Sequence, residues 1–374
     1  MKKKIVAVLL TAAMVMTMTA CGSNDAQQTN QTEAETSEED AAETANESED
    51  AADETEAAQT AEPSATYKVG IVQYVDDASL NQIEKAIEAE LDAKGEELGV
   101  SFDYADYTYN GQADSTTLNQ IATDLVASEV DIIVPIATPT AMIMQNATEE
   151  NQIPVVFSAV SDPVGAGLVQ SMDVPGSNIT GTSDALDTEA IFNLMLAANP
   201  DVKKVGLLYD KSQDSSKAAN EAAKAYCDEK GIEVIEKTGT TNDEISLAAD
   251  ALVAAGVDAV FTPSDNTVMT AELAIFEKFK EAKIPHYCGA DSFALNGAFM
   301  GYGVNYEQLG TVTADMVVDI LVGGNDISQT AVRTLDNGIV TVNTETAEAI
   351  GLDYSVFADM CDSLVETRTA EEFE

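Results

Sequence analysis

The sequence predicts an α/β protein with two lobes, each a parallel sheet covered by helices, and three observations support this prediction. Apolar runs typical of buried strands alternate with segments of helical periodicity from residue 68 onward. The same order restarts at residue 204. Short motifs of the first half also recur in the second half at similar spacing. Alternation of this kind indicates parallel sheets.

In the first half, the pattern of apolar residues predicts strands and helices in alternating order. The run Lys68–Tyr74 is a buried strand, and Leu80, Ile83 and Ile87 then recur at helical spacing. The later elements of this half follow the same alternation. Further strands are expected at 100–107, 130–137 and 153–160, and further helices at 116–128 and 139–150.

Three strand motifs align between the halves. Lys68–Ile71 matches Lys204–Leu207, Val130–Ile133 matches Val257–Val260, and Ile153-Pro154 matches Ile284-Pro285. Short apolar motifs also recur by chance, which is the alternative explanation. Because ligands of open α/β sheets bind outside the carboxyl ends of the strands, the expected site is the cleft between the two lobes.

Small polar residues follow the strand ends of both halves. Thr138 precedes Pro139 as an N-cap precedes a proline at the first helical position, so the free N–H groups there favour a carboxylate. Asp265 is the corresponding cap in the second half and is expected to face a cation. The sequence thus predicts a carboxylate site on one lobe and an ammonium site on the other, although any single cap of this type is more often purely structural.

Aromatic and nucleophilic residues leave alternatives open. Tyr74, Tyr209 and Tyr306 fit either walls that stack on a ligand or ordinary half-buried tyrosines. His286 and Cys288 would share a strand face, but no positioned third group accompanies them, so a packed strand histidine is expected rather than a catalytic pair. We therefore expect no enzyme activity. Nucleotide-binding glycine loops are absent from the sequence, so no cofactor is expected.

Composition excludes one class of partner and constrains the cysteines. The chain has 374 residues with 18 basic and 66 acidic side chains, a net charge of −48, which argues against nucleic acid. Its four cysteines, Cys21, Cys227, Cys288 and Cys361, have the spacing of neither a disulfide scaffold nor a zinc site. The sequence predicts free thiols at Cys227, Cys288 and Cys361, and no metal.

The N-terminal segment has the pattern of an export signal. Lys2–Lys4 precede the apolar run Ile5–Thr19, and Met18-Thr19-Ala20-Cys21 resembles a bacterial lipoprotein box. We expect a lipoprotein signal peptide at 1–20, then lipidated Cys21 and a disordered acidic linker at 21–65, because this linker lacks the apolar residues for a core. An ordinary signal peptide is the alternative, and either one predicts an extracytoplasmic protein.

Several loop motifs carry a family resemblance that covers about residues 67–335. The motifs are Ala137–Ala141, Val160–Val169, Asn178–Asp184, Pro263–Val268 and Gly303–Gly310. With these motifs the chain resembles the ABC-transporter substrate-binding proteins of the tryptophan/tyrosine type. The resemblance implies a type I periplasmic-binding-protein fold, in which a hinge of three crossings joins two Rossmann-like lobes. It also implies a permease and an ATPase as partners.

The resemblance also implies a set of cleft residues and domain boundaries. Lobe 1 is expected at 66–181 plus 293–325, and lobe 2 at 182–292 plus 326–374, with a tail beyond the matched region. We expect Asp291 to pair with a ligand ammonium and Asp265 to assist. The predicted ligand-binding residues are Gln73, Tyr74, Thr138, Thr140, Ala141, Ser161, Asp162, Thr182, Ser183, Asp184, Tyr209, Asp265, Asn266, Asp291 and Asn305.

The leading hypothesis for function is a lipid-anchored solute receptor of an ABC importer. Its ligand would be a small zwitterion, most plausibly an aromatic L-amino acid, held between the lobes. A sensory module that binds a ligand and reports to a membrane receptor would share every cleft residue and is the alternative.

Overall fold

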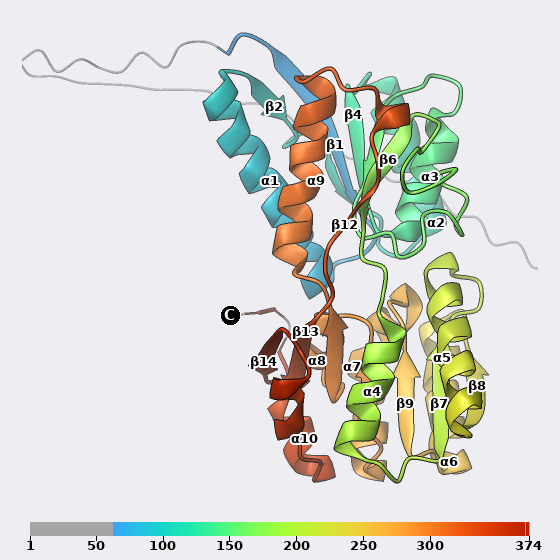
Figure 1. Ribbon diagram of the computed structural model, residues 1–374. Helices are drawn as coiled ribbons and strands as arrows, with labels where there is room; N and C mark the ends of the chain where they lie inside the picture. Colours follow the sequence, from blue (N-terminus) through green and yellow to red (C-terminus); the bar gives the residue numbers. More distant parts are fainter. Residues whose placement is uncertain (1–62, 371, 374) are drawn as a thin grey trace, which may run out of the picture. The chain divides into compact units, whose positions relative to one another are not determined.

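The computed structural model describes residues 63–370, 372 and 373, which belong to one compact unit. The expected signal peptide and Cys21 lie outside the described residues. Within them the chain forms two sheets of seven strands each, flanked by helices (Figure 1). We call each sheet with its helices a lobe. The predicted fold class is confirmed.

Lobe 1 is built on an all-parallel sheet with the strand order β12-β6-β5-β4-β1-β2, in which β3 also pairs with β1. Helices α1 and α9 pack against each other along their length (Figure 1). The strands are β1 (Thr66–Gln73), β2 (Ser101–Asp103), β3 (Thr108–Asn110), β4 (Ile132–Ile136), β5 (Val155–Phe157), β6 (Ile179–Ser183) and β12 (Arg333–Thr334). The helices are α1 (Ala78–Leu98), α2 (Ser115–Ala127), α3 (Thr138–Thr148), α9 (Tyr306–Leu321) and the short η2 (Ile327–Gln329).

Lobe 2 has the strand order β14-β13-β11-β10-β9-β7-β8, and only the β11–β13 pair is antiparallel. Its strands are β7 (Lys204–Tyr209), β8 (Glu233–Thr238), β9 (Ala259–Thr262), β10 (His286–Cys288), β11 (Met300–Gly303), β13 (Ile339–Asn343) and β14 (Ser363–Thr367). Its helices are α4 (Thr188–Ala198), η1 (Asp214–Ser216), α5 (Lys217–Lys230), α6 (Asn242–Ala255), α7 (Asn266–Ala282), α8 (Asp291–Leu295), α10 (Thr344–Ile350) and η3 (Ser355–Asp359).

The predicted repeat has a packing counterpart in both lobes. A Cβ at Gly70 in β1 would lie 2.8 Å from Cδ2 of Leu125 in α2, and a Cβ at Gly206 in β7 would lie 2.8 Å from Cδ2 of Leu252 in α6. Only glycine allows these helices to approach their strands so closely. The same strand glycine therefore meets the same helix leucine in each lobe, as expected for a duplicated unit.

The chain crosses between the lobes three times, after β6, between β11 and α9, and between β12 and β13. The second crossing follows Gly303, later than the expected boundary at 293, because α8 and β11 complete the second sheet. The third follows Thr334, later than the expected 326, because β12 pairs with β6 of lobe 1. The C-terminal tail then supplies β13 and β14 to lobe 2, which gives that segment a structural role.

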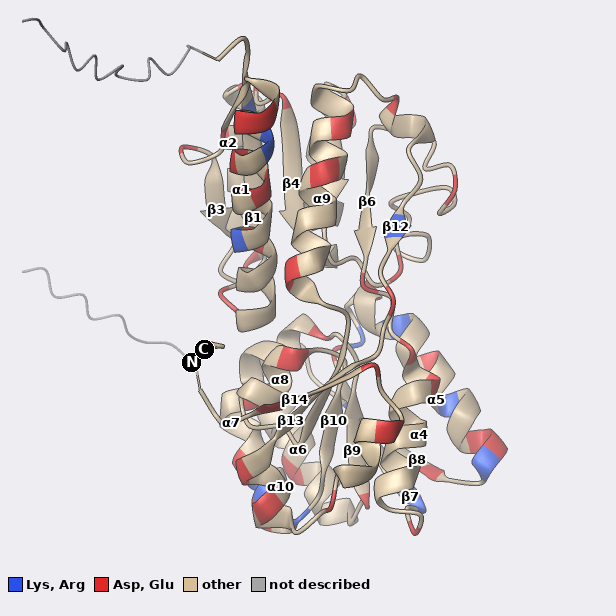
Figure 2. Cartoon of the chain, turned by 60° about the vertical axis from the view of Figure 1, so that its left-hand side comes forward, with Lys and Arg blue, Asp and Glu red and all other residues tan. Residues whose placement is uncertain are grey.

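The lobes are in contact at the ends of their strands, where one cluster of buried apolar residues continues from lobe 1 into lobe 2. Acidic residues are distributed over the helices of both lobes, whereas basic residues are few (Figure 2). No helix among residues 63–370 has the length and apolar character needed to cross a membrane. Among the cysteines that the structure describes, Cys227, Cys288 and Cys361 are free thiols, as predicted.

Candidate functional site

A small cavity lies between the lobes, at the carboxyl ends of the strands of both sheets. Its volume is about 20 Å³, close to the space of one water molecule, so the lobes must separate before a larger molecule can enter. The first turns of α1, α3, α7 and α9 reach it, together with the first crossing. The lining residues are Ser79, Leu80, Ala137, Thr138, Ala159, Ser161, Asp184, Ser215, Ser264, Asn266, Met269, Ala290 and Tyr306.

Helix α3 begins at this cavity without a side-chain cap. Its N-cap position is Ala137, and Pro139 lies in the first turn. The sequence-based assignment of Thr138 as the N-cap is therefore wrong by one residue. By contrast, Asp77 and Asp265 accept hydrogen bonds from the first N–H groups of α1 and α7, whose first turns line the same cavity. The N–H groups of α3 thus remain available to an anion from outside the helix.

Two hydroxyl groups at the start of α3 are buried without a partner. The Oγ1 atoms of Thr138 and Thr140 make no hydrogen bond among the described residues, although each side chain is at most 2% exposed. An unpaired buried hydroxyl costs about 1–3 kcal/mol. Thr138 lines the cavity, so a bound ligand could recover this cost.

The backbone next to α3 is strained. Ala137 and Ala159 have φ angles of 80° and 54°, and both line the cavity. A positive φ is unfavourable for alanine and is retained where the surrounding structure requires it. These two positions place the strand ends of β4 and β5 against the cavity.

Among the residues that the structure describes, Asp184 at the first crossing is the one carboxylate that lines the cavity. Ser161 donates a hydrogen bond to its Oδ1 at 3.1 Å. Burial raises the pKa of Asp184 to about 6, and the Ser161 hydrogen bond opposes this shift. Burial also raises the pKa of Tyr306 well above its usual value, and the nearby carboxylates Asp184, Asp291 and Asp77 add to the rise. A cation would be stabilised among these groups.

Asp291 connects the lobes and does not line the cavity. Its carboxylate accepts hydrogen bonds from the hydroxyl of Ser79 and from Nε2 of Gln82, the latter at 3.1 Å. Both donors belong to α1 of lobe 1. Burial raises the pKa of Asp291, and these hydrogen bonds oppose the rise.

Asp265 is engaged entirely within lobe 2. Its side chain accepts hydrogen bonds from the backbone N–H groups of Asp210, Thr267 and Val268 and from the hydroxyl of Ser216. Burial raises its pKa to about 6. The four donors give this carboxylate a structural role in shaping the loop beside the cavity, and the residue itself does not reach the cavity wall.

The other predicted residues are divided between positions near the cavity and positions in the supporting structure. Thr138, Ser161, Asp184 and Asn266 line the cavity. Gln73, Thr182 and Ser183 are buried at the ends of β1 and β6, and Thr140 and Ala141 are buried in α3. The remaining four make contacts outside the cavity. The Asp162 carboxylate accepts a hydrogen bond from the backbone N–H of Gly165, and the Tyr209 hydroxyl donates one to the carboxylate of Glu236. Asn305 caps α9, and Tyr74 packs against both neighbouring apolar clusters.

Several lining residues were not predicted. The predicted set lacked Ser79, Leu80, Ser215 and Met269. Asp77, directly before the helical periodicity of α1, is an N-cap signal that identifies the helix start where Ser79 and Leu80 lie. Asp77 is itself 7% exposed, and burial raises its pKa to about 6.

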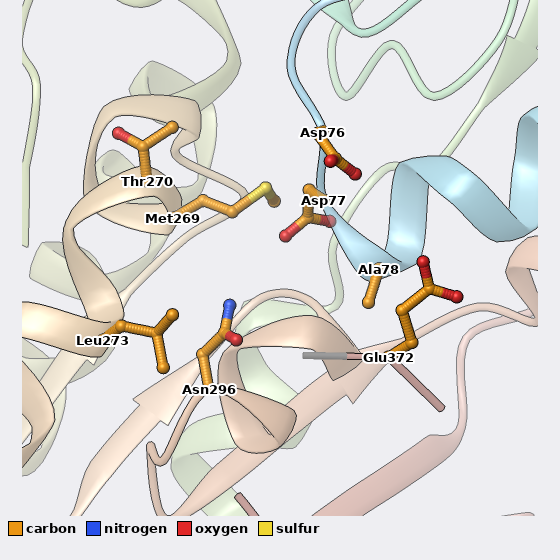
Figure 3. Close-up of a pocket in the computed structure, with 8 residues that line it drawn as sticks. All are labelled: Asp76, Asp77, Ala78, Met269, Thr270, Leu273, Asn296 and Glu372. Atoms are coloured by element: carbon orange, nitrogen blue, oxygen red, sulfur yellow. The ribbon is translucent and has the colours of Figure 1, made fainter. Parts of the chain in front are cut away.

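A second, wider pocket of about 300 Å³ lies beside the cavity, between the start of α1 and helices α7 and α8. Figure 3 shows the side chains of Asp77 and Met269 pointing toward each other across it. Met269 lines both pockets and therefore separates them. The other lining residues are Asp76, Ala78, Thr270, Leu273, Asn296 and Glu372.

His286 is part of the packing of lobe 2. Its Nδ1 lies 3.1 Å from Oε1 of Glu272 and its Nε2 lies 2.8 Å from Oγ1 of Thr262. The ring is 2% exposed, and burial raises the pKa of Cys288 well above its usual value. These contacts correspond to the packed strand histidine that the sequence predicts.

Similar proteins share this architecture. A tyrosine-binding protein of Clostridioides difficile (strain R20291) is 32% identical over 286 residues, which cover 76% of this chain and 81% of that protein. The crystal structure of an ABC domain in complex with L-Trp from Streptococcus pneumoniae is 29% identical, with a TM-score of 0.74 over 80% of this chain and 100% of the other. A ligand-free, open structure of a substrate binding protein with adhesive properties from Clostridium difficile is 31% identical, with a TM-score of 0.62 over 81% and 100% of the two chains.

The family model described as "ABC transporter substrate binding protein" matches residues 68–356, which span both lobes and all three crossings. This match covers most of the chain and includes every residue that lines the cavity. The chain therefore belongs to the ABC transporter substrate binding protein family.

Proposed function

We propose that this protein is the extracytoplasmic solute-binding lipoprotein of an ABC importer and that it binds an aromatic L-amino acid between its lobes. An ABC permease and its ATPase would be its partners. The lobes would close around the ligand, which makes contacts in the closed state that are unavailable in the open one. No bond is made or broken in this function.

The observation that carries the proposal is the pairing of an uncapped helix terminus with a carboxylate at one cavity. The N–H groups of α3 and the unpaired hydroxyl of Thr138 are donors suited to a ligand carboxylate. The carboxylate of Asp184 is an acceptor suited to a ligand ammonium. Within residues 63–370, no lysine, arginine or histidine lines the cavity. A zwitterionic α-amino acid presents both complementary charges within a few atoms.

The apolar part of the wall supports an aromatic side chain on this ligand. Leu80, Met269 and Tyr306 contribute large apolar surfaces beside the polar groups. Two similar proteins, the tyrosine-binding protein of Clostridioides difficile and the ABC domain in complex with L-Trp, agree with this assignment. Asp184, rather than the predicted pair Asp291 and Asp265, is the ammonium partner we propose, because the other two carboxylates are occupied by protein donors.

Native mass spectrometry of protein purified without denaturation tests the proposal. The expected result is a retained adduct with the mass of tyrosine, tryptophan or phenylalanine, which disappears after unfolding and refolding. Asp184→Asn should retain less of it. A retained sugar would defeat the amino-acid assignment.

The proposed anchor at Cys21 rests on the sequence motif. A diacylglycerol thioether with an amide-linked chain supplies the two hydrophobic signals that stable membrane attachment needs. Cys21→Ala should therefore release the protein from the membrane fraction, and Cys361→Ala is the matched control that should not. A Cys21→Ala protein that remains with membranes after a high-salt wash would contradict the lipoprotein assignment.

A further inference from the structure

The side-chain amide of Asn266 has a fixed orientation at the cavity. Its Nδ2 donates a hydrogen bond to Oε1 of Gln213 at 2.9 Å. The same Oε1 accepts the backbone N–H of Asn266 at 3.2 Å. A backbone N–H can only donate, so this atom of Gln213 must be the oxygen, and the atom of Asn266 that faces it must be the nitrogen.

Gln213 is itself held from its other end. Its Nε2 donates to Oγ1 of Thr267 at 2.7 Å, and that hydroxyl donates to Asp210 at 2.9 Å. Gln213 is 8% exposed and Asn266 is 4% exposed. This chain of hydrogen bonds prevents either amide from turning over without the loss of buried hydrogen bonds.

The carbonyl oxygen of Asn266 is consequently free to accept. No donor from the described residues contacts Oδ1, and Asn266 lines the cavity. The two lobe 2 hydroxyls at the cavity already use their protons inside the lobe, since Ser264 donates to the carbonyl of Gly289 and Ser215 to Gln213. The lobe 2 side of the cavity therefore offers hydrogen-bond acceptors without charge.

The groups suited to bind the ligand's two charges lie on the lobe 1 side of the cavity. The α3 terminus belongs to lobe 1, and Asp184 lies where the chain leaves it. If the ligand is an amino acid, as the proposed function holds, its carboxylate and ammonium are held there. Its side chain is then directed toward lobe 2.

We infer that Oδ1 of Asn266, oriented by Gln213, accepts a hydrogen bond from a donor on the ligand's aromatic side chain. The phenol O–H of tyrosine and the indole N–H of tryptophan are such donors, and phenylalanine has none. Phenylalanine would bury the Asn266 oxygen unpaired, which is the usual basis for discrimination against a ligand that lacks one polar group. Gln213 contacts no ligand in this scheme and is a positioning residue.

Calorimetric titrations of the full chain with L-tyrosine, L-tryptophan and L-phenylalanine test the inference. The native protein should bind tyrosine at least about fivefold more tightly than phenylalanine, because phenylalanine would leave the buried acceptor without a partner. Asn266→Leu should reduce this ratio to about twofold or less, since the acceptor is gone. Gln213→Met should lower the ratio part of the way, because the amide of Asn266 can then rotate.

A double-mutant cycle separates positioning from a general structural effect. In the Asn266→Leu background, Gln213→Met should not change the tyrosine-to-phenylalanine ratio further. Gln120→Met, on the exposed face of α2, is the matched control and should leave the ratio unchanged. Melting curves identify any variant that does not fold, and Asn266→Leu alone still decides the question if Gln213→Met unfolds.

Two results would overturn the inference, and they have different consequences for the proposed function. If the native protein binds none of the three amino acids, the proposed function fails and the inference fails with it. If it binds them but the tyrosine-to-phenylalanine ratio is equal in the native and Asn266→Leu proteins, the proposed function stands and only the inference is wrong.

Discussion

The hydroxyl of Ser79 donates a hydrogen bond to the carboxylate of Asp291, and this bond joins the first turn of α1 in lobe 1 to the start of α8 in lobe 2. Gln82, from the next turn of α1, donates to the other carboxylate oxygen at 3.1 Å. Both carboxylate oxygens of Asp291 thus accept hydrogen bonds from lobe 1. A residue that the sequence predicts as a ligand partner instead stabilises the closed arrangement of the lobes.

Asp291→Asn should therefore shift the protein toward an open arrangement. The asparagine nitrogen cannot accept a hydrogen bond, so one of the two interlobe bonds is lost. We expect a larger radius of gyration by small-angle scattering without ligand and about three- to tenfold weaker binding of L-tryptophan. Asp250→Asn, which affects an ion pair with Lys278 on the surface of lobe 2, should change neither quantity. An unchanged radius together with unchanged affinity would show that Asp291 does not control closure.

Thr138→Val should weaken binding and leave the fold at least as stable. The substitution removes a buried hydroxyl that has no partner in the described part of the chain, so the free energy of unfolding should stay the same or rise. Affinity for L-tryptophan should fall about three- to tenfold because a donor to the ligand carboxylate is lost. Calorimetry and thermal melting measure the two effects separately.

Thr188→Val provides a control of the same chemistry. The Oγ1 of Thr188 is also buried and unpaired among the described residues, but it lies at the start of α4, away from the cavity. Thr188→Val should change the free energy of unfolding in the same direction as Thr138→Val, without an effect on the affinity for L-tryptophan. Equal losses of affinity in the two variants would remove Thr138 from the site.

The buried carboxylates make stability and binding respond to pH in opposite directions. Burial raises the pKa of Asp77, Asp184 and Asp265 to about 6. These three carboxyl groups therefore bind protons more tightly in the folded protein than in the unfolded chain, so their contribution to stability is fully present below the unfolded pKa and is lost as pH rises through about 6. The melting temperature without ligand should be higher at pH 5 than at pH 7.5 by about 3–6 °C.

Binding should weaken over the same range as the pH falls. Asp184 must be ionised to pair with an ammonium group, so affinity for L-tryptophan should drop below pH 6, at most about tenfold per pH unit. In Asp184→Asn this dependence should largely disappear. A pH-independent affinity in the native protein between pH 5 and pH 7.5 would exclude Asp184 as the ammonium partner.

The fold was predictable because its signals are local. The strand glycines Gly70 and Gly206 occupy equivalent positions in the two repeats, and the alternation of strand and helix patterns locates both sheets. The lobe boundaries were less predictable, since the short strand β12 has no apolar run of its own and exists through pairing with β6. The antiparallel pairing of β13 with β11 is likewise decided by tertiary contacts.

The candidate site was predictable only in part, for a related reason. Strand-end position identified Thr138 and Asn266, the family resemblance implied Asp184, and all three line the cavity. The sequence could not distinguish Asp184 from Asp265 as a ligand partner, because the difference lies in the donors that surround each carboxylate. Asp265 has four such donors from its own lobe, of which two lie 2 and 3 positions away along the chain and two lie 49 and 55 positions away. Met269 was missed because it lies inside a helical pattern, where methionine normally indicates core packing.

The central claim, an aromatic amino acid bound between the lobes, has a direct measurement because the chain contains no tryptophan. Any indole emission in a titration therefore comes from the ligand. On protein that has been unfolded, refolded and shown native by circular dichroism, added L-tryptophan should show shifted, saturable emission as the ring leaves water, and tyrosine should reverse the shift by competition. Emission that stays that of free tryptophan at every protein concentration, with no competition by tyrosine or phenylalanine, would contradict the account.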